Sequence, residues 1–312
     1  MRDIAAWLRS HDDFAVVPHV SPDGDSYGSC IAMALALKSI GKRAFVAAPP
    51  VPLMYDFLPA QDLIHMGDDM PYAPKSIVHM DTASPDRIAV QFENGAETAL
   101  IDHHETNAGF DDVRWIKGDA SSVGEMLMSL LHEMKIAITK EMAICIYTAI
   151  STDTGNFQFA STTPESLRAT AELIECGLEI GEVSTHLFRS RTLARTQLLG
   201  EALHAMELKN GGKIAMTIVT KEMMARCGAG HPDTEGIVNY LNEIRGVKAA
   251  AMLEERDGET KVSLRSQEWI DVAQIARSLG GGGHKSAAGV TIKAEPSRAA
   301  EILMEKLGEA VG

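Results

Sequence analysis

The chain has 312 residues, of which 45% are hydrophobic and 23% charged, which is typical of a soluble enzyme with two domains. Its formal net charge of −14 argues against a protein that grips long nucleic acid, and it favours a small substrate or a short one in a local basic pocket. Four scattered cysteines without a CxxC pair argue against a disulfide framework or a zinc knuckle. No signal peptide or membrane span is recognisable, so we expect a cytoplasmic protein without membrane contact.

Short apolar runs alternate with helical patterns through the first half of the chain. Buried strands are predicted at Phe14–Val20, Lys42–Ala48, Ser76–Met80 and Thr98–Ile101. Helices are predicted at Tyr27–Ile40, Val123–Met134 and Glu141–Ile150. Strands that alternate with helices predict an α/β domain with a mostly parallel sheet and helices on both faces.

The second half contains a different set of elements. A charged helical stretch at Arg189–Leu208 has no obvious partner strand and is interpreted as a connector. The pattern then restarts, with strands at Lys213–Thr220, Val247–Glu254, Lys261–Arg265 and Gly289–Lys293, and helices at Thr234–Ile244, Asp271–Leu279 and from Pro296. We therefore expect a first domain at 1–188, a helical hinge at 189–209, and a smaller α/β domain at 210–312 that faces the first across a cleft.

Asp and His residues follow three of the predicted strands. The segment HVSPDGDS follows the first strand, Asp81 follows Ser76–Met80, and Asp102-His103-His104 follows Thr98–Ile101, while Asp153 closes a helical run. In an open parallel sheet, ligands bind at the carboxyl ends of the strands, so these clusters could converge on one crevice. Hydrolysis of a phosphate ester needs a hydroxide near neutral pH and compensation of oxygen charge, and two metal ions supply both.

Each cluster also has a simpler interpretation. Asp81 taken alone is more often a helix cap or a turn residue, PDGDS forms a plausible turn, and adjacent histidines are often only a polar loop. Four independent caps that all lie where strands and helices end are nevertheless a less economical explanation than one site.

Five segments carry a resemblance to a known family. HVSPDGDS, MDTAS, IDHHETN and STDTGNF resemble the four ordered motifs of the DHH phosphoesterases, which include RecJ-like exonucleases. GGGGHKSAAG, at Gly280–Gly289, resembles the glycine-rich signature of the C-terminal DHH-associated domain. The resemblance covers nearly the whole chain, and it is most like the stand-alone nanoRNase, or oligoribonuclease and pAp-phosphatase, type.

The resemblance implies two divalent ions that share one carboxylate. The implied ligands are His19, Asp23 and Asp81 for one ion, and Asp25, Asp81, His103 and Asp153 for the other. Carboxylate and imidazole together favour manganese, with magnesium or cobalt as alternatives. His104 would face the scissile phosphate and Asp102 would orient an imidazole, with direct metal ligation by Asp102 as the alternative. Ser26 stands where many relatives have alanine, a small change that we expect to leave the ions unaffected.

The resemblance also implies a substrate site in the second domain. Its candidate residues are Arg265 and Ser266, Asn239, and Gly282, Gly283 and His284. Arg265 is the best candidate to clamp a terminal phosphate, and glycines would let backbone N–H groups approach it. The glycine run also fits a helix exit, and Asn239 also fits a solvated helix position.

The expected substrates are short oligonucleotides such as pApA, and 3′-phosphoadenosine 5′-phosphate (pAp). The alternatives are a single-strand exonuclease of the RecJ type, a cyclic di-AMP or pApA phosphodiesterase, and, from another functional class, an inactive nucleotide sensor. A long-strand exonuclease needs a basic track that this composition does not favour. The resemblance also allows a homodimer formed through the first domain.

Overall fold

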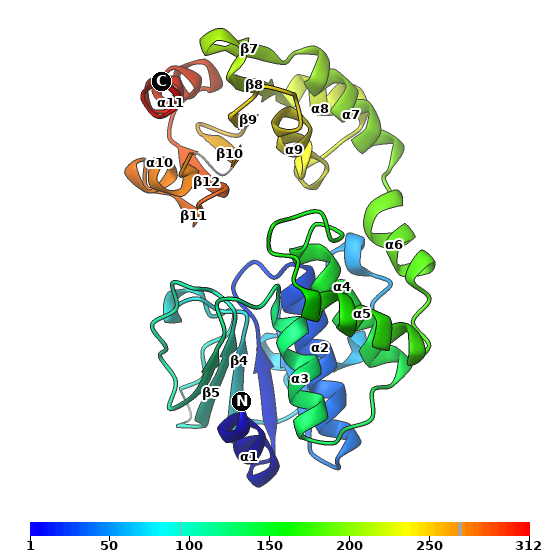
Figure 1. Ribbon diagram of the computed structural model, residues 1–312. Helices are drawn as coiled ribbons and strands as arrows, with labels where there is room; N and C mark the ends of the chain where they lie inside the picture. Colours follow the sequence, from blue (N-terminus) through cyan, green and yellow to red (C-terminus); the bar gives the residue numbers. More distant parts are fainter. Residues whose placement is uncertain (94, 268–269) are drawn as a thin grey trace. The chain divides into compact units, whose positions relative to one another are not determined.

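The computed structural model describes residues 1–93, 95–267 and 270–312. Contacts divide the chain into two compact units, Met1–Ser190 and Arg191–Gly312 (Figure 1). Each unit is built around a six-stranded sheet with helices packed against it, so the predicted α/β class is confirmed. Within the described residues, no helix combines the length and the apolar character needed to cross a membrane.

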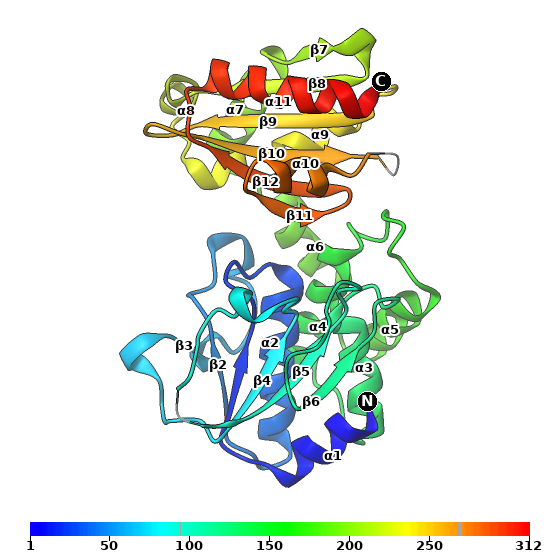
Figure 2. The same ribbon diagram turned by 90° about the vertical axis from the view of Figure 1, so that its left-hand side faces the viewer.

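The sheet of the first unit is parallel, with the strand order β3-β2-β1-β4-β5-β6 (Figure 2). Its strands are β1 (Phe14–Val17), β2 (Ala44–Ala47), β3 (Ile64–His65), β4 (Ser76–Met80), β5 (Glu97–Asp102) and β6 (Val113–Ile116). The chain builds outward from β1 to one edge and then returns through β4 to build the other. Such a reversal opens a crevice at the carboxyl ends of the central strands.

The helices of the first unit share one large core with one face of the sheet (Figure 1). They are α1 (Arg2–Ser10), α2 (Gly24–Ser39), α3 (Val123–Glu133), α4 (Lys140–Asp153), α5 (Pro164–Glu175) and α6 (Ile180–Arg189). The opposite face packs against loops that include the 3-10 helices Gly67–Asp69 and Pro85–Arg87. Helices were expected on both faces, but the segments after β3 and β4 are rich in proline, glycine and aspartate, which interrupt helices.

Helices α2 and α4 approach each other closely because α2 has glycine at the contact. A Cβ atom at Gly28 would lie 2.3 Å from the carbonyl oxygen of Cys145, and one at Gly24 would lie 2.4 Å from the side chain of Thr152. Real Cβ atoms do not approach other heavy atoms so closely, so a side chain at either position would push the helices apart. The two glycines therefore bring the first turn of α2 against the last turn of α4.

The second unit has a mixed sheet in the order β11-β12-β10-β9-β8-β7, in which β8 and β9 are parallel (Figure 2). Its strands are β7 (Glu207–Lys209), β8 (Ile214–Val219), β9 (Ala249–Glu255), β10 (Thr260–Ser266), β11 (Gly282–His284) and β12 (Ala287–Ile292). One face packs against α10 (Val272–Ser278) and α11 (Pro296–Val311). The other packs against α7 (Leu193–His204), α8 (Lys221–Cys227) and α9 (Ile237–Asn242).

Two of the departures from the expected boundaries have a clear structural cause. Strand β1 ends at Val17 because the next residue is Pro18, which has no N–H for the ladder. Within the expected connector, Leu198 and Ala202 of α7 are fully buried in a core of the second unit. Helix α7 is therefore part of that unit, and its burial depends on strands that follow it in the sequence.

Candidate metal centre

Asp and His side chains from distant segments meet at the carboxyl ends of β1, β4 and β5. His19 lies two residues after β1, Asp81 follows β4 directly, and His103 follows the last residue of β5. Asp25 lies in the first turn of α2, and Asp153 is the last residue of α4. The parallel order β1-β4-β5 brings the strand ends together, and the close contact of α2 with α4 adds the two helix ends.

These side chains form three groups whose ligand atoms lie within 4.8 Å of one another. The groups are His19-Asp23-Asp81, Asp25-His103-Asp153 and Asp81-His103-His104. We call the residues of these groups the Asp–His cluster. It contains every residue for which metal ligation was expected, together with His104.

Asp81 lies at the centre of the Asp–His cluster. Its Oδ2 lies 3.7 Å from Nε2 of His19, whereas its Oδ1 lies 3.6 Å from Nε2 of His103. The backbone of Asp81 is left-handed, with φ of 54°, a conformation that Asp tolerates better than most residues. Its N–H donates to the carbonyl of Ile101 at 3.0 Å. The two carboxylate oxygens therefore face different histidines, as expected of a ligand shared by two ions.

Asp25 is fully buried, and both of its oxygens accept hydrogen bonds from the first turn of α3. The N–H groups of Val123 and Gly124 donate to Asp25 at 2.7 and 3.0 Å. A helix N-terminus carries partial positive charge and stabilises a carboxylate. Burial nevertheless raises the pKa of Asp25 well above its usual value, and the charge of Asp153 adds to the effect. Helix α3 thus positions this carboxylate without neutralising it.

His103 is surrounded by acidic groups, the nearest of which is Asp153 Oδ2 at 3.1 Å from its Nε2. Burial alone would lower the pKa of His103, but the hydrogen bond to Asp153 and the charges of Asp25 and Asp81 raise it to about 11. Burial also raises the pKa of Asp81 and Asp153. The raised pKa values reflect carboxylates that are buried close to one another and repel in their charged forms. A divalent cation would offset that repulsion, so the donor set fits such an ion.

His19 and Asp23 lie beside Asp81 at the start of α2. Asp23 is the N-cap of this helix, and its Oδ1 accepts from the N–H of Ser26 at 3.1 Å. Burial lowers the pKa of His19, which favours the neutral imidazole that metals bind. In its simpler interpretation PDGDS was expected only as a turn, and the structure shows that Asp23 caps α2 through Oδ1, which leaves Oδ2 for a cation.

Asp102 holds His104 in one orientation. Asp102 accepts from Nδ1 of His104 at 2.8 Å and from Nδ2 of Asn107 at 2.5 Å. Burial alone would raise the pKa of Asp102, but these hydrogen bonds hold it below its usual value. Asn107 also donates to the carbonyl of Thr82 at 3.0 Å, which joins the loops after β4 and β5. No role was predicted for Asn107, although it closes the segment IDHHETN.

Arg265, on β10 of the second unit, is half-buried and has no acidic partner among the described residues. Its guanidinium donates to the carbonyl of Leu264 at 2.9 Å, and no carboxylate of the described residues lies within 4.0 Å of it. Burial lowers its pKa. The neighbouring Ser266, expected at the substrate site, donates its hydroxyl to the carbonyl of Ile270 at 2.6 Å. The hydroxyl of Ser266 therefore stabilises the loop after β10, whereas Arg265 donates to one carbonyl within the part of the chain that the structure describes.

The remaining candidates of the second unit lie on α9 and β11. Asn239 is exposed on α9. Gly280, with φ of 87°, ends α10, as a helix exit requires. A Cβ atom at Gly283 would lie 2.5 Å from a carbonyl oxygen of β12, whereas Gly282 has open space around it. Gly282 and Gly283 belong to edge strand β11, and the side chain of His284 lies outside the described part of the structure.

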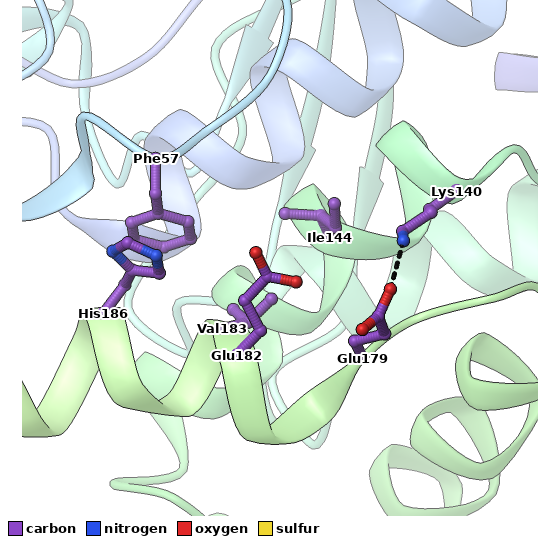
Figure 3. A pocket seen from close by; sticks show the side chains of 7 residues that line it. All are labelled: Phe57, Lys140, Ile144, Glu179, Glu182, Val183 and His186. Carbon is purple, nitrogen blue, oxygen red and sulfur yellow. Dashed lines mark hydrogen bonds and ion pairs between the residues drawn. The ribbon is translucent and has the colours of Figure 1, made fainter.

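A separate pocket of the first unit lies beside α4 and α6 (Figure 3). The rings of Phe57 and His186 are stacked there, with centroids 5.0 Å apart, and Lys140 forms an ion pair with Glu179 at 2.5 Å. These contacts join α6 to the rest of the unit. The pocket contains no residue of the Asp–His cluster.

Comparison with known proteins identifies relatives along nearly the whole chain. Residues 217–311 match the DHHA1 domain, and residues 13–150 match the DHH family, N-terminal domain. The chain is 34% identical to the bifunctional oligoribonuclease and PAP phosphatase NrnA of Thermus thermophilus, over 99% of this chain and 94% of that protein. It is 30% identical to the protein of the same name from Bacillus subtilis, over 90% of each.

A solved structure shows the same fold. The crystal structure of an exopolyphosphatase-related protein from Bacteroides fragilis aligns with a TM-score of 0.91 and 26% identity, over 99% of this chain and 95% of that one. Apart from Asp153, the Asp–His cluster lies within the residues that match the DHH domain. The chain therefore belongs to the DHH family of phosphoesterases, with a DHHA1 domain after the DHH domain.

Proposed function

We propose that this protein hydrolyses short oligonucleotides such as pApA, and pAp, with two divalent cations bound by the Asp–His cluster. The observation that carries the proposal is the position of Asp81, whose two oxygens face two separate groups of ligands. The names of the relatives from Thermus thermophilus and Bacillus subtilis support this substrate class.

The proposed ligand sets follow the geometry of the cluster. One ion would be held by His19, Asp23 and Asp81, and the other by Asp25, Asp81, His103 and Asp153. Mixed carboxylate and imidazole ligands favour manganese, with magnesium or cobalt as alternatives. When bound, two such ions lower the pKa of an attacking water and offset charge on the attacking and leaving oxygens.

His104 is proposed to contact the substrate and not to bind a cation. Its Nδ1 donates to Asp102 at 2.8 Å, so this nitrogen is already occupied. The hydrogen bond orients the ring through Nδ1, and Nε2, when it carries a proton, would donate to the scissile phosphate or the leaving oxygen. Asp102 stays ionised near neutral pH because its pKa is lowered, and Asn107 fixes its second oxygen.

The second unit is proposed to hold the terminal phosphate of the substrate. Arg265 supplies a half-buried guanidinium without a carboxylate partner among the described residues, which suits bidentate binding of a phosphate. Gly282, on the edge strand β11, leaves its backbone open to a ligand. Asn239 and His284 remain proposed contacts to the nucleotide.

The test is a comparison of initial rates with manganese on pApA, pAp and an RNA of about 24 nucleotides. Fast turnover of the two short substrates with little turnover of the RNA would support the proposal. Comparable turnover of the RNA would favour a single-strand exonuclease of the RecJ type. Binding of nucleotide without turnover of any substrate would favour a sensor.

A further inference from the structure

We propose that Ser26 is a positioning residue that fixes two ligands of the His19-Asp23-Asp81 group and thereby sets the affinity of that site for its cation. The inference rests on the proposed function only in that the Asp–His cluster must bind divalent cations. It replaces the expectation that residue 26 leaves the ions unaffected, which considered only the size of the side chain.

Ser26 contacts two carboxylates of the group at once. It lies in the first turn of α2 with no exposed surface. Its Oγ donates to Oδ2 of Asp81 at 2.6 Å, and its N–H donates to Oδ1 of Asp23 at 3.1 Å. A single residue thus joins a ligand at the start of α2 to a ligand after β4.

The hydrogen bond from Ser26 reaches only one side of Asp81. Oδ2, which accepts it, is the oxygen that lies 3.7 Å from His19, whereas Oδ1 faces His103. The bond restrains rotation of the carboxylate, so the side chain of Asp81 loses less conformational freedom when a cation binds. Its loss should therefore weaken the His19-Asp23-Asp81 site more than the Asp25-His103-Asp153 site.

Ser29 shows that the hydroxyl of Ser26 is not a general requirement of α2. Serine in a helix often donates back to the carbonyl one turn earlier. Ser29 does so, and its Oγ donates to the backbone carbonyl of Asp25 at 2.6 Å. Both serines are fully buried in the same helix. Ser29→Ala is therefore a matched control that removes the same atoms without changing a contact to a carboxylate.

The experiment is calorimetric titration of the metal-free protein with Mn²⁺, for the wild type, Ser26→Ala and Ser29→Ala. Loss of a hydrogen-bond partner that orients a metal ligand typically lowers metal affinity about 10–100-fold. We expect Ser26→Ala to lower the affinity for Mn²⁺ about 10-fold at one site and less than about twofold at the other. Ser29→Ala should retain both affinities. Unchanged affinities in Ser26→Ala, or equal losses in both variants, would overturn the inference.

Double variants identify which ion is affected. In an Asp153→Asn background, the remaining ion depends on the His19-Asp23-Asp81 group, and Ser26→Ala should weaken it. In a His19→Ala background, Ser26→Ala should have little effect on the remaining ion. The opposite pattern would contradict the assignment to this group.

Two further measurements distinguish failure of this inference from failure of the proposed function. Ser26→Cys keeps the shape of the side chain but donates weakly, so it should lose affinity as Ser26→Ala does if the hydrogen bond is responsible. Retained affinity in Ser26→Cys would count against that bond. A wild-type protein that binds no divalent cation would refute the proposed function as well, whereas normal binding by the wild type and Ser26→Ala alike would refute the inference alone.

Discussion

The two units differ sharply in charge. Met1–Ser190 carries 13 Lys and Arg against 27 Asp and Glu, a net charge of −14, whereas Arg191–Gly312 carries 16 against 16, a net charge of zero. The acidity of the chain thus belongs entirely to the unit that contains the Asp–His cluster. An argument against nucleic-acid substrates from total charge therefore does not apply to the unit that carries Arg265.

The units also differ in the partners that surround their buried carboxylates. Glu254 of the second unit is fully buried and accepts from Arg256 at 2.9 Å and from Thr234 at 2.9 Å, which hold its pKa below the usual value despite burial. Asp25 and Asp81 of the first unit are buried beside other carboxylates, and their pKa is raised. A buried acid with satisfied charge stabilises the fold, whereas several buried acids with unsatisfied charge indicate a candidate cation site.

The largest expected effect comes from Asp81→Asn. Asparagine tolerates the left-handed backbone of this position, so the fold should be kept while the shared carboxylate is lost. We expect kcat with manganese to fall by more than about 100-fold. Loss of a direct metal ligand should lower activity more than loss of a residue that only orients a ligand. Steady-state kinetics on pApA would measure this.

The same variant tests whether the buried carboxylates of the first unit repel one another, unlike Glu254 of the second unit. Asp81→Asn removes one of several carboxylates that repel one another, so the unfolding temperature of the metal-free protein should not fall. Calorimetry in the presence of a chelator would check this. A clear drop in unfolding temperature, or wild-type turnover with manganese, would show that Asp81 is structural and not a shared ligand.

The next effect concerns the glycine contact that builds the first unit. Gly28→Ala should lower the free energy of unfolding by about 2–3 kcal/mol, because the new Cβ would lie 2.3 Å from the carbonyl oxygen of Cys145. Gly200→Ala, inside α7 of the second unit, is the matched control, since nothing lies within 4 Å of its Cβ position. That change should raise stability by about 0.5–1 kcal/mol. Equal effects in denaturant titration would contradict this account.

Local signals in the sequence predicted some elements well and others not at all. Strand β4 (Ser76–Met80) was predicted at its observed bounds, because a short apolar run flanked by turn residues is a local pattern. Helix α5 was not predicted. Its buried face consists mainly of Ser166, Ala169, Thr170 and Leu173, while Leu167 is exposed, so few large apolar residues mark that face in the sequence. Its position depends on packing against α4, which single-segment patterns do not contain.

The same distinction applies to the site. Asp and His at strand ends are visible in the sequence because the residue types themselves indicate metal chemistry. The contributions of Gly28, Ser26 and Asn107 depend on contacts with segments distant in the chain, namely with Cys145, Asp81 and Thr82. The resemblance placed Ser266 at the substrate site, and its hydrogen bond to the carbonyl of Ile270 is a further contact that the sequence pattern did not indicate.

A smaller effect is expected from Arg265→Gln. If the guanidinium binds a terminal phosphate equally well before and during reaction, KM should rise about 10-fold while kcat changes little. Lys261→Gln removes one positive charge from an exposed position on the same strand and should leave both constants near wild type. A large fall in kcat at constant KM would instead place Arg265 at the transition state. Equal effects of both variants would indicate a general charge effect.

The smallest expected effect concerns the satisfied carboxylate of the second unit. The folded-state pKa of Glu254 lies below the ordinary 4.5, so its contribution to stability is fully present above that value and is lost as the pH falls through the folded pKa. Glu254→Gln should lower the free energy of unfolding by about 1–2 kcal/mol at neutral pH. The deficit should shrink in acid, where the wild type also loses its charge. Urea titrations across pH, with exposed Glu243→Gln as control, would measure it. A deficit that stays constant with pH would mean that shape, and not charge, makes Glu254 stabilising.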